Sequence, residues 1–147
     1  MKRSFRTAVS VMALAGGMIG ANASPASAAT SASRYGCTVT PASPYITYYN
    51  GVKYAEANVY VRCTVSRSGI VNAQIRESDN GFDQHVSSVG SAEFSIPAGG
   101  TRKVITVRGR CTNFDSVGNE ELFTRAMINV GGLNSDWAQT LNVSTSC

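Results

Sequence analysis

The stretch ANVYVRCTV, residues 57–65, alternates between apolar and polar side chains along its whole length. A period of two residues is typical of a β-strand that buries one face and exposes the other. The stretch therefore predicts a half-buried strand with Tyr60 and Arg62 on its outward face. The residues predicted to face inward are Ala57, Val59, Val61, Cys63 and Val65.

The same alternation recurs along most of the chain, interrupted by turn-forming residues such as Asn50-Gly51 and Gly131-Gly132. Short strands at regular intervals predict an all-β fold, an antiparallel two-sheet sandwich. The expected strands cover residues 37–40, 45–49, 57–66, 70–77, 91–96, 103–111, 122–130 and 137–146. The further inward positions are Val71, Ala73, Ile75, Ala92, Phe94, Ile96, Ile105, Val107, Gly109, Cys111, Leu122, Ala126, Ile128, Val130, Trp137, Leu141, Val143 and Cys147.

The first 29 residues have the features of a secretory signal peptide. Three basic residues near the start precede an Ala- and Gly-rich run, and Ala26-Ser27-Ala28 matches the small-x-small cleavage pattern. The run is too short for a membrane-spanning helix, which needs about 20 apolar residues. It resembles the leaders of exported actinobacterial proteins. We expect residues 1–29 to be removed, residues 30–147 to form one domain, and the product to be secreted.

The net charge of the whole chain, +4, overstates that of the expected mature domain. From residue 30 onward there are ten basic and nine acidic residues, so the net charge falls to +1. A nearly neutral total removes the global electrostatic case for nucleic acid or an anionic membrane as the partner.

Four cysteines, Cys37, Cys63, Cys111 and Cys147, would enter an oxidising compartment with the exported chain. An even number of cysteines in a small secreted domain indicates disulfides. Zinc ligands come in pairs two to four residues apart, and these cysteines are far more widely spaced. We therefore expect two structural disulfides, no metal and no cofactor.

The segments TVSRSG, residues 64–69, and IPAGGTRKVITV, residues 96–107, each join one expected strand to the next. In this order of strands the chain resembles bacterial immunoglobulin-like domains, which implies an immunoglobulin-like sandwich. The buried Trp and the inter-sheet cystine of antibody domains have no counterpart here, so no immunoglobulin function is carried over.

This strand order selects one of the three possible cysteine pairings. The strand of Cys37 runs antiparallel to the strand of Cys63, which brings the start of the first to the end of the second. The strands that end in Cys111 and Cys147 run in the same direction, which places both cysteines at one end of the sandwich. The expected disulfides are Cys37–Cys63 and Cys111–Cys147.

Motifs for catalysis are weak. His85 has Asp83, Ser87 and Ser88 close by in sequence, but neighbours in sequence do not make a catalytic triad. Acidic and amide residues around Asp79-Asn80-Gly81 could supply calcium ligands, yet they lack the twelve-residue loop pattern and fit a hairpin turn equally well. We therefore expect a protein that is not an enzyme.

Two groups of residues are candidates for a binding surface. Five tyrosines crowd around the Asn50-Gly51 turn, where they suit contacts with sugars or proteins, although tyrosine also favours edge strands. A basic stretch follows near residues 102–110, whose outward arginines could bind phosphate or carboxylate, or could merely protect a sheet edge. The candidate ligand-binding residues are Tyr48, Tyr49, Tyr54, Tyr60, Arg62, Arg108 and Arg110.

We expect a secreted, non-catalytic binding module for an anionic wall polymer, another polysaccharide or an extracellular protein. The first alternative is an extracellular inhibitor or toxin-like effector that presents an exposed loop, at residues 79–85 or 113–120, to a target. The second is a small hydrolase that uses His85.

Overall fold

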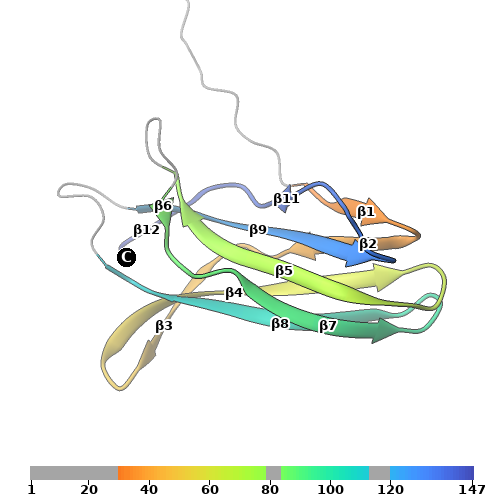
Figure 1. Cartoon of the computed structure of the whole chain (residues 1–147). Helices are drawn as coiled ribbons and strands as arrows, with labels where there is room; N and C mark the ends of the chain where they lie inside the picture. The colour runs from red at the N-terminus through yellow and green to blue at the C-terminus, as the bar shows by residue number, and fades with distance from the viewer. Residues whose placement is uncertain (1–29, 79–83, 113–119) are drawn as a thin grey trace, which may run out of the picture.

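The computed structural model describes residues 30–78, 84–112 and 120–147, and these residues form strands and turns without a helix (Figure 1). No helix in these ranges could therefore cross a membrane. The strands are β1 (Ala32–Arg34), β2 (Cys37–Pro41), β3 (Tyr45–Tyr49), β4 (Val52–Cys63), β5 (Arg67–Glu77), β6 (Gln84–His85), β7 (Gly90–Ile96), β8 (Thr101–Arg110), β9 (Glu120–Val130), β10 (Leu133–Asn134), β11 (Ala138–Gln139) and β12 (Val143–Thr145).

Two antiparallel sheets form the two layers of the fold (Figure 1). In the first, sheet A, the long strand β4 pairs with β8 along one edge, and with β3 and then β2 along the other, while β1 extends the sheet beyond β2. In the second, sheet B, β5 lies between β9 on one side and β6 and β7 on the other, and β10, β11 and β12 pair with β9. The prediction of two antiparallel sheets is confirmed.

The core lies between the sheets and is built by the alternating inward residues of the long strands. In β4, every second residue from Ala55 to Cys63 is fully buried, and Val71, Ala73 and Ile75 of β5 face them from sheet B. Both predicted disulfides are present, Cys37–Cys63 and Cys111–Cys147. Cys37 lies directly opposite Cys63 in the β2–β4 register, as the antiparallel order of these strands requires.

Three inward positions were predicted wrongly. Val65 is 44% exposed because β4 ends at Cys63 and the chain turns toward β5. Trp137 and Leu141 are 38% and 45% exposed. The expected last strand is broken into β11 and β12, whose registers on β9 differ by one residue, so the inward phase changes between them.

A threonine hydroxyl bridges this break. The backbone N–H of Thr140 donates to the Thr124 carbonyl oxygen over 2.9 Å, and the backbone N–H of Thr124 donates to Oγ1 of Thr140 over 3.0 Å. The hydroxyl replaces a backbone acceptor that the shifted chain no longer supplies, and Thr140 is buried in place of its apolar neighbours.

Removal of a disulfide should destabilise the fold through the entropy of the unfolded chain. Double replacement of Cys111 and Cys147 by Ala opens a loop of 36 residues and should lower the free energy of unfolding by about 4 kcal/mol. Urea denaturation of the variant beside the oxidised parent measures this loss. An unchanged midpoint would contradict a stabilising role for this bridge.

Gly109 in β8 leaves room for the chain that follows β6. A Cβ atom built on Gly109 would overlap the carbonyl oxygen of Val86, and this backbone is itself hydrogen-bonded to Ile75. Gly109→Ala should therefore destabilise the protein by about 1–3 kcal/mol, as overpacking does. Thr106→Ala on the exposed face of the same strand is the control, and thermal unfolding should show a clearly smaller change for it.

Candidate binding surface

The outer face of sheet A gathers most of the side chains that the sequence singled out for binding. In an antiparallel sheet, residues directly opposite each other point to the same face, so the register of β4 with its neighbours defines this face. Its members are Tyr45, Thr47 and Tyr49 of β3, Thr38 and Thr40 of β2, Tyr54, Glu56, Asn58, Tyr60 and Arg62 of β4, and Thr101, Lys103, Thr106, Arg108 and Arg110 of β8.

A β-bulge decides which cation of β8 joins this face. The β4–β8 register shifts between Val59, which pairs with Ile105, and Tyr60, which pairs with Lys103. Regular alternation from Arg108 would place residue 102 on the outer face. Because the bulge inserts one residue, Lys103 points outward beside Tyr60 instead, and residue 102 is in register with the buried Val61.

Glu56 connects strands of sheet A close to the β3–β4 hairpin, which projects at the lower left of Figure 1. Glu56 is 5% exposed, and its carboxylate accepts a hydrogen bond from the Tyr49 hydroxyl at 2.8 Å and from the Tyr45 hydroxyl at 3.1 Å. Nε of Arg108 donates to the same carboxylate and forms an ion pair with it. One buried acid thus links three strands.

The aromatic rings around Glu56 complete this cluster. The Arg108 guanidinium carbon lies 3.8 Å from the centre of the Tyr49 ring and 5.8 Å from that of Tyr54. The two rings meet edge to face, with centres 5.6 Å apart. The sequence predicted Arg108 as an outward cation free to bind a ligand; its side chain is 46% exposed, but its charge is already matched by Glu56.

The cluster changes the acidity of two of its members. Burial alone would raise the pKa of the Glu56 carboxyl, but the three hydrogen bonds that it accepts outweigh burial and hold its pKa below the ordinary value. Burial and the hydrogen bond to Glu56 raise the pKa of the Tyr45 hydroxyl. Near neutral pH the carboxylate is therefore charged and the hydroxyl is protonated, which is the combination that the hydrogen bonds require.

The remaining cations of the face have no carboxylate partner among the described residues. Arg62, Lys103 and Arg110 are exposed. Lys103 lies opposite Tyr60, which is 39% exposed, and Arg62 lies two residues further along β4, whereas Arg110 lies opposite Tyr54 at the other end of the face. Glu56 is the single carboxylate among the described residues of sheet A, and Arg108 engages it. The part of the face around Tyr60 is therefore positively charged through Arg62 and Lys103, beside an exposed tyrosine ring.

Tyr48 does not belong to the outer face. It lies opposite Lys53 in the β3–β4 register, so it points to the other side of the hairpin, where it is 64% exposed. On that side Nζ of Lys53 donates to the backbone carbonyl oxygen of Ser146 and thereby ties the hairpin to the C-terminal segment. Tyr48 is thus separated from the other candidate residues.

The candidate residues for catalysis and calcium are only partly within the described ranges. His85 is exposed on β6, and Ser87 is buried with its hydroxyl accepting a hydrogen bond from the Ile75 N–H. Asp79, Asn80, Asp83 and most of both candidate effector loops lie outside the described residues. Within those ranges no group of three His, Cys, Asp or Glu side chains is placed to hold a metal ion.

Sequence reasoning counted Tyr45 in the tyrosine cluster but missed its contact with Glu56, and it did not select Glu56 or Lys103 as members of this surface. A two-residue turn at Asn50-Gly51 pairs Tyr49 with Val52 and hence Tyr45 with Glu56. The contact between Tyr45 and Glu56 could therefore have been predicted from the turn motif. The position of Lys103 depends on the bulge, for which the sequence carries no comparable signal.

Glu56→Gln should lower the free energy of unfolding by about 2 kcal/mol at neutral pH, because a buried charged acceptor of three hydrogen bonds is lost. The pKa of Glu56 is lower in the folded protein than in the unfolded chain, where it is near 4.5, so the ionised carboxylate stabilises the fold above pH 4.5. This stabilisation disappears as the pH falls through the pKa of the folded state. The difference between parent and variant, measured by urea denaturation, should shrink below about pH 4.5. A pH-independent difference would contradict the ionised state of Glu56, and Glu93→Gln on β7 is the exposed control.

Comparison of the chain with models of protein families, with curated proteins and with solved structures finds no match.

Proposed function

We propose that the chain is a secreted, non-catalytic binding module, and that its ligand is an anionic extracellular polysaccharide bound on the outer face of sheet A. The observation that carries this proposal is the positive charge of Arg62 and Lys103 beside Tyr60, which no carboxylate among the described residues of sheet A matches. A polymer with repeating oxyanions complements such a face.

The distribution of acids between surface and interior supports an anionic partner. Among the described residues, Glu56, Glu77 and Glu120 are buried, at 5%, 0% and 1% exposure. The exposed carboxylates in the same ranges belong to sheet B or its connections, at Glu93, Glu121 and Asp136. The near-neutral net charge of the expected mature domain therefore hides a described surface on which basic side chains predominate.

The chemistry of the face suits a sugar chain. Arg62 can hold a carboxylate, sulfate or phosphate through two parallel hydrogen bonds, and Lys103 supplies a compact charge beside it. The exposed ring of Tyr60 offers a flat apolar surface with a hydroxyl at its edge. Threonines 38, 40, 101 and 106 add hydroxyl groups around the ring, in rows set by the strand register.

We further propose that the two sheets have an immunoglobulin-like topology, with β2, β4 and β8 as strands A, B and E, and with β7, β5, β9 and the β11–β12 segment as strands C′, C, F and G. This assignment follows the observed pairing of β4 with β2 and β8, and of β5 with β7 and β9. The fold serves here as a rigid support for the binding face, since an immunoglobulin-like fold by itself implies no particular function.

The double variant Arg62→Ala/Lys103→Ala should raise the Kd for polygalacturonate at least about tenfold, because two unmatched cations are removed from the face. The dependence of binding on salt should also weaken, since fewer counterions are released. Isothermal titration at two salt concentrations measures both effects on the mature, oxidised protein.

The matched control is Lys53→Ala/Arg125→Ala, which removes the same charge from outside this face. Equal losses in both double variants would reduce the effect to net charge and contradict a specific surface. Equal affinity for polygalacturonate and for double-stranded DNA would contradict the choice of a polysaccharide.

A further inference from the structure

Tyr35 occupies a position that tyrosine rarely takes. Arg34 pairs with Cys37, so Tyr35 and Gly36 form the two-residue turn between β1 and β2. Their φ angles are 47° and 80°, in the left-handed region. Asn followed by Gly is the favoured pair for such a turn, as at Asn50-Gly51 in this same chain, whereas a bulky side chain there is strained. Something other than turn formation must account for tyrosine at this position.

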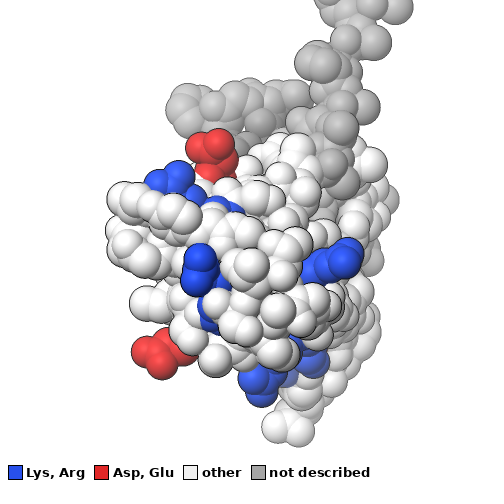
Figure 2. All heavy atoms as spheres, turned by 90° about the vertical axis from the view of Figure 1, so that its right-hand side faces the viewer, with Lys and Arg blue, Asp and Glu red and all other residues white. Residues whose placement is uncertain are grey.

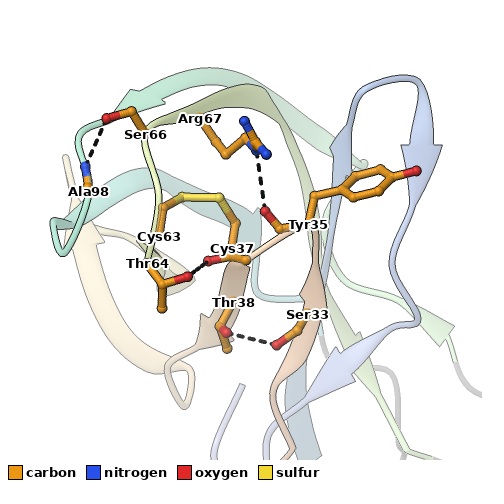
Figure 3. The surroundings of a disulfide bond; sticks show 10 residues. Ser33, Tyr35, Cys37, Thr38, Cys63, Thr64, Ser66, Arg67 and Ala98 are labelled. Atoms are coloured by element: carbon orange, nitrogen blue, oxygen red, sulfur yellow. Dashed lines mark hydrogen bonds between the residues drawn. A yellow bond between two sulfur atoms is a disulfide. The ribbon is translucent and has the colours of Figure 1, made fainter.

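Packing in the core does not explain why a tyrosine occupies this position. Tyr35 is 50% exposed, and its side chain points away from the nearby disulfide (Figure 3). One side lies against the β9–β10 turn, where a Cβ added to Gly131 would meet the ring at 3.6 Å. The Arg34 guanidinium lies 4.9 Å from the ring centre. The ring is therefore held in place by its surroundings while much of it faces solvent.

The turn that carries Tyr35 is locked into the end of the fold. The Cys37–Cys63 disulfide joins its base to β4, and the backbone N–H of Thr64 donates to the Gly36 carbonyl oxygen over 2.8 Å. Nε of Arg67 donates to the Tyr35 carbonyl oxygen over 3.4 Å, so this guanidinium also lies beside the turn (Figure 3). These neighbouring residues therefore hold the turn in its strained conformation.

Positive charge surrounds this end of the molecule. Arg34 and Arg67 flank the turn, while Arg62, Arg102 and Lys103 lie at the adjoining ends of β4 and β8. Figure 2 looks onto this end and shows basic side chains spread across it, with acidic ones confined to two places near its rim. Within the described residues, neither Arg34 nor Arg67 forms an ion pair with a carboxylate.

We propose that Tyr35, Arg34 and Arg67 form a second binding site, which takes one anionic sugar unit of the polymer bound on sheet A. The sugar ring stacks on the exposed Tyr35 ring, and the two guanidinium groups bind its carboxylate or sulfate. The site rests on the proposed function for the class of its ligand. Its residues are distinct from Tyr60 and Lys103. A role of the ring in binding the ligand explains why a tyrosine occupies a turn position that favours asparagine.

Tyr35→Asn tests this site, because asparagine tolerates the left-handed conformation and keeps the turn while removing the ring. We expect an unfolding midpoint within about 3 °C of the parent and at least a fivefold rise in the Kd for polygalacturonate. Tyr35→Phe keeps the ring and should bind nearly as the parent does. Polyphosphate, an anion without a sugar ring, should bind Tyr35→Asn as it binds the parent but should lose affinity for Arg34→Ala/Arg67→Ala.

A folded Tyr35→Asn variant that binds polygalacturonate with unchanged affinity would overturn the second site. So would an Arg34→Ala/Arg67→Ala variant with unchanged affinity for both polymers. Failure of the proposed function gives a different result from failure of the second site alone, since the parent protein would then bind none of the anionic polymers. If Arg62→Ala/Lys103→Ala weakens binding while the Tyr35 variants do not, the sheet A surface stands and the second site is refuted.

Discussion

The two-residue alternation of β4 is the constraint on which both the core and the binding face depend. From Ala55 to Cys63, every second residue of this strand is fully buried against sheet B. The residues between them, from Tyr54 to Arg62, form the middle of the outer face. A slip of one residue would exchange the two sets, so burial of small and branched apolar side chains fixes which way Tyr60 and Arg62 point. The Cys37–Cys63 disulfide, formed between directly opposed residues, excludes such a slip at the end of the strand.

Burial also determines which charged side chains are exposed to a partner. A net charge near zero predicts a surface without strong electrostatic preference, but this holds only if acids and bases are equally exposed. Here three glutamates are buried among the described residues, and Glu56 uses its charge to organise Tyr45, Tyr49 and Arg108. Every described Lys and Arg is exposed or half-buried, because long basic side chains reach water easily. The charge available to a partner is therefore larger than the composition indicates.

Alternation and turn chemistry predicted the features that depend on local pattern. The inward faces of β4, β5 and β9, the antiparallel order and both disulfides follow from short-range periodicity and the strand order that it implies. The errors arise where one inserted residue changes the phase. Trp137 was assigned to the core because the break before β12 gives no signal in composition, and Lys103 was overlooked because a bulge turns it outward. Such shifts depend on how neighbouring strands fit, which a single sequence does not express.

The two hairpin turns of sheet A illustrate how a rigid frame permits unfavourable local choices. Asn50 and Gly51 suit their left-handed conformations, and the β3–β4 hairpin that they close projects from the fold. The contacts of this hairpin with β8 and with the C-terminal segment, through Arg108 and Lys53, lie away from the turn itself. Tyr35 takes the equivalent position in the β1–β2 turn, where the disulfide, the Thr64 hydrogen bond and Arg67 surround it. A turn held by its neighbours can carry a residue chosen for its side chain, whereas an isolated turn must be formed by residues that favour it. The strain therefore lies at the one turn of this sheet where covalent and hydrogen-bonded support is concentrated.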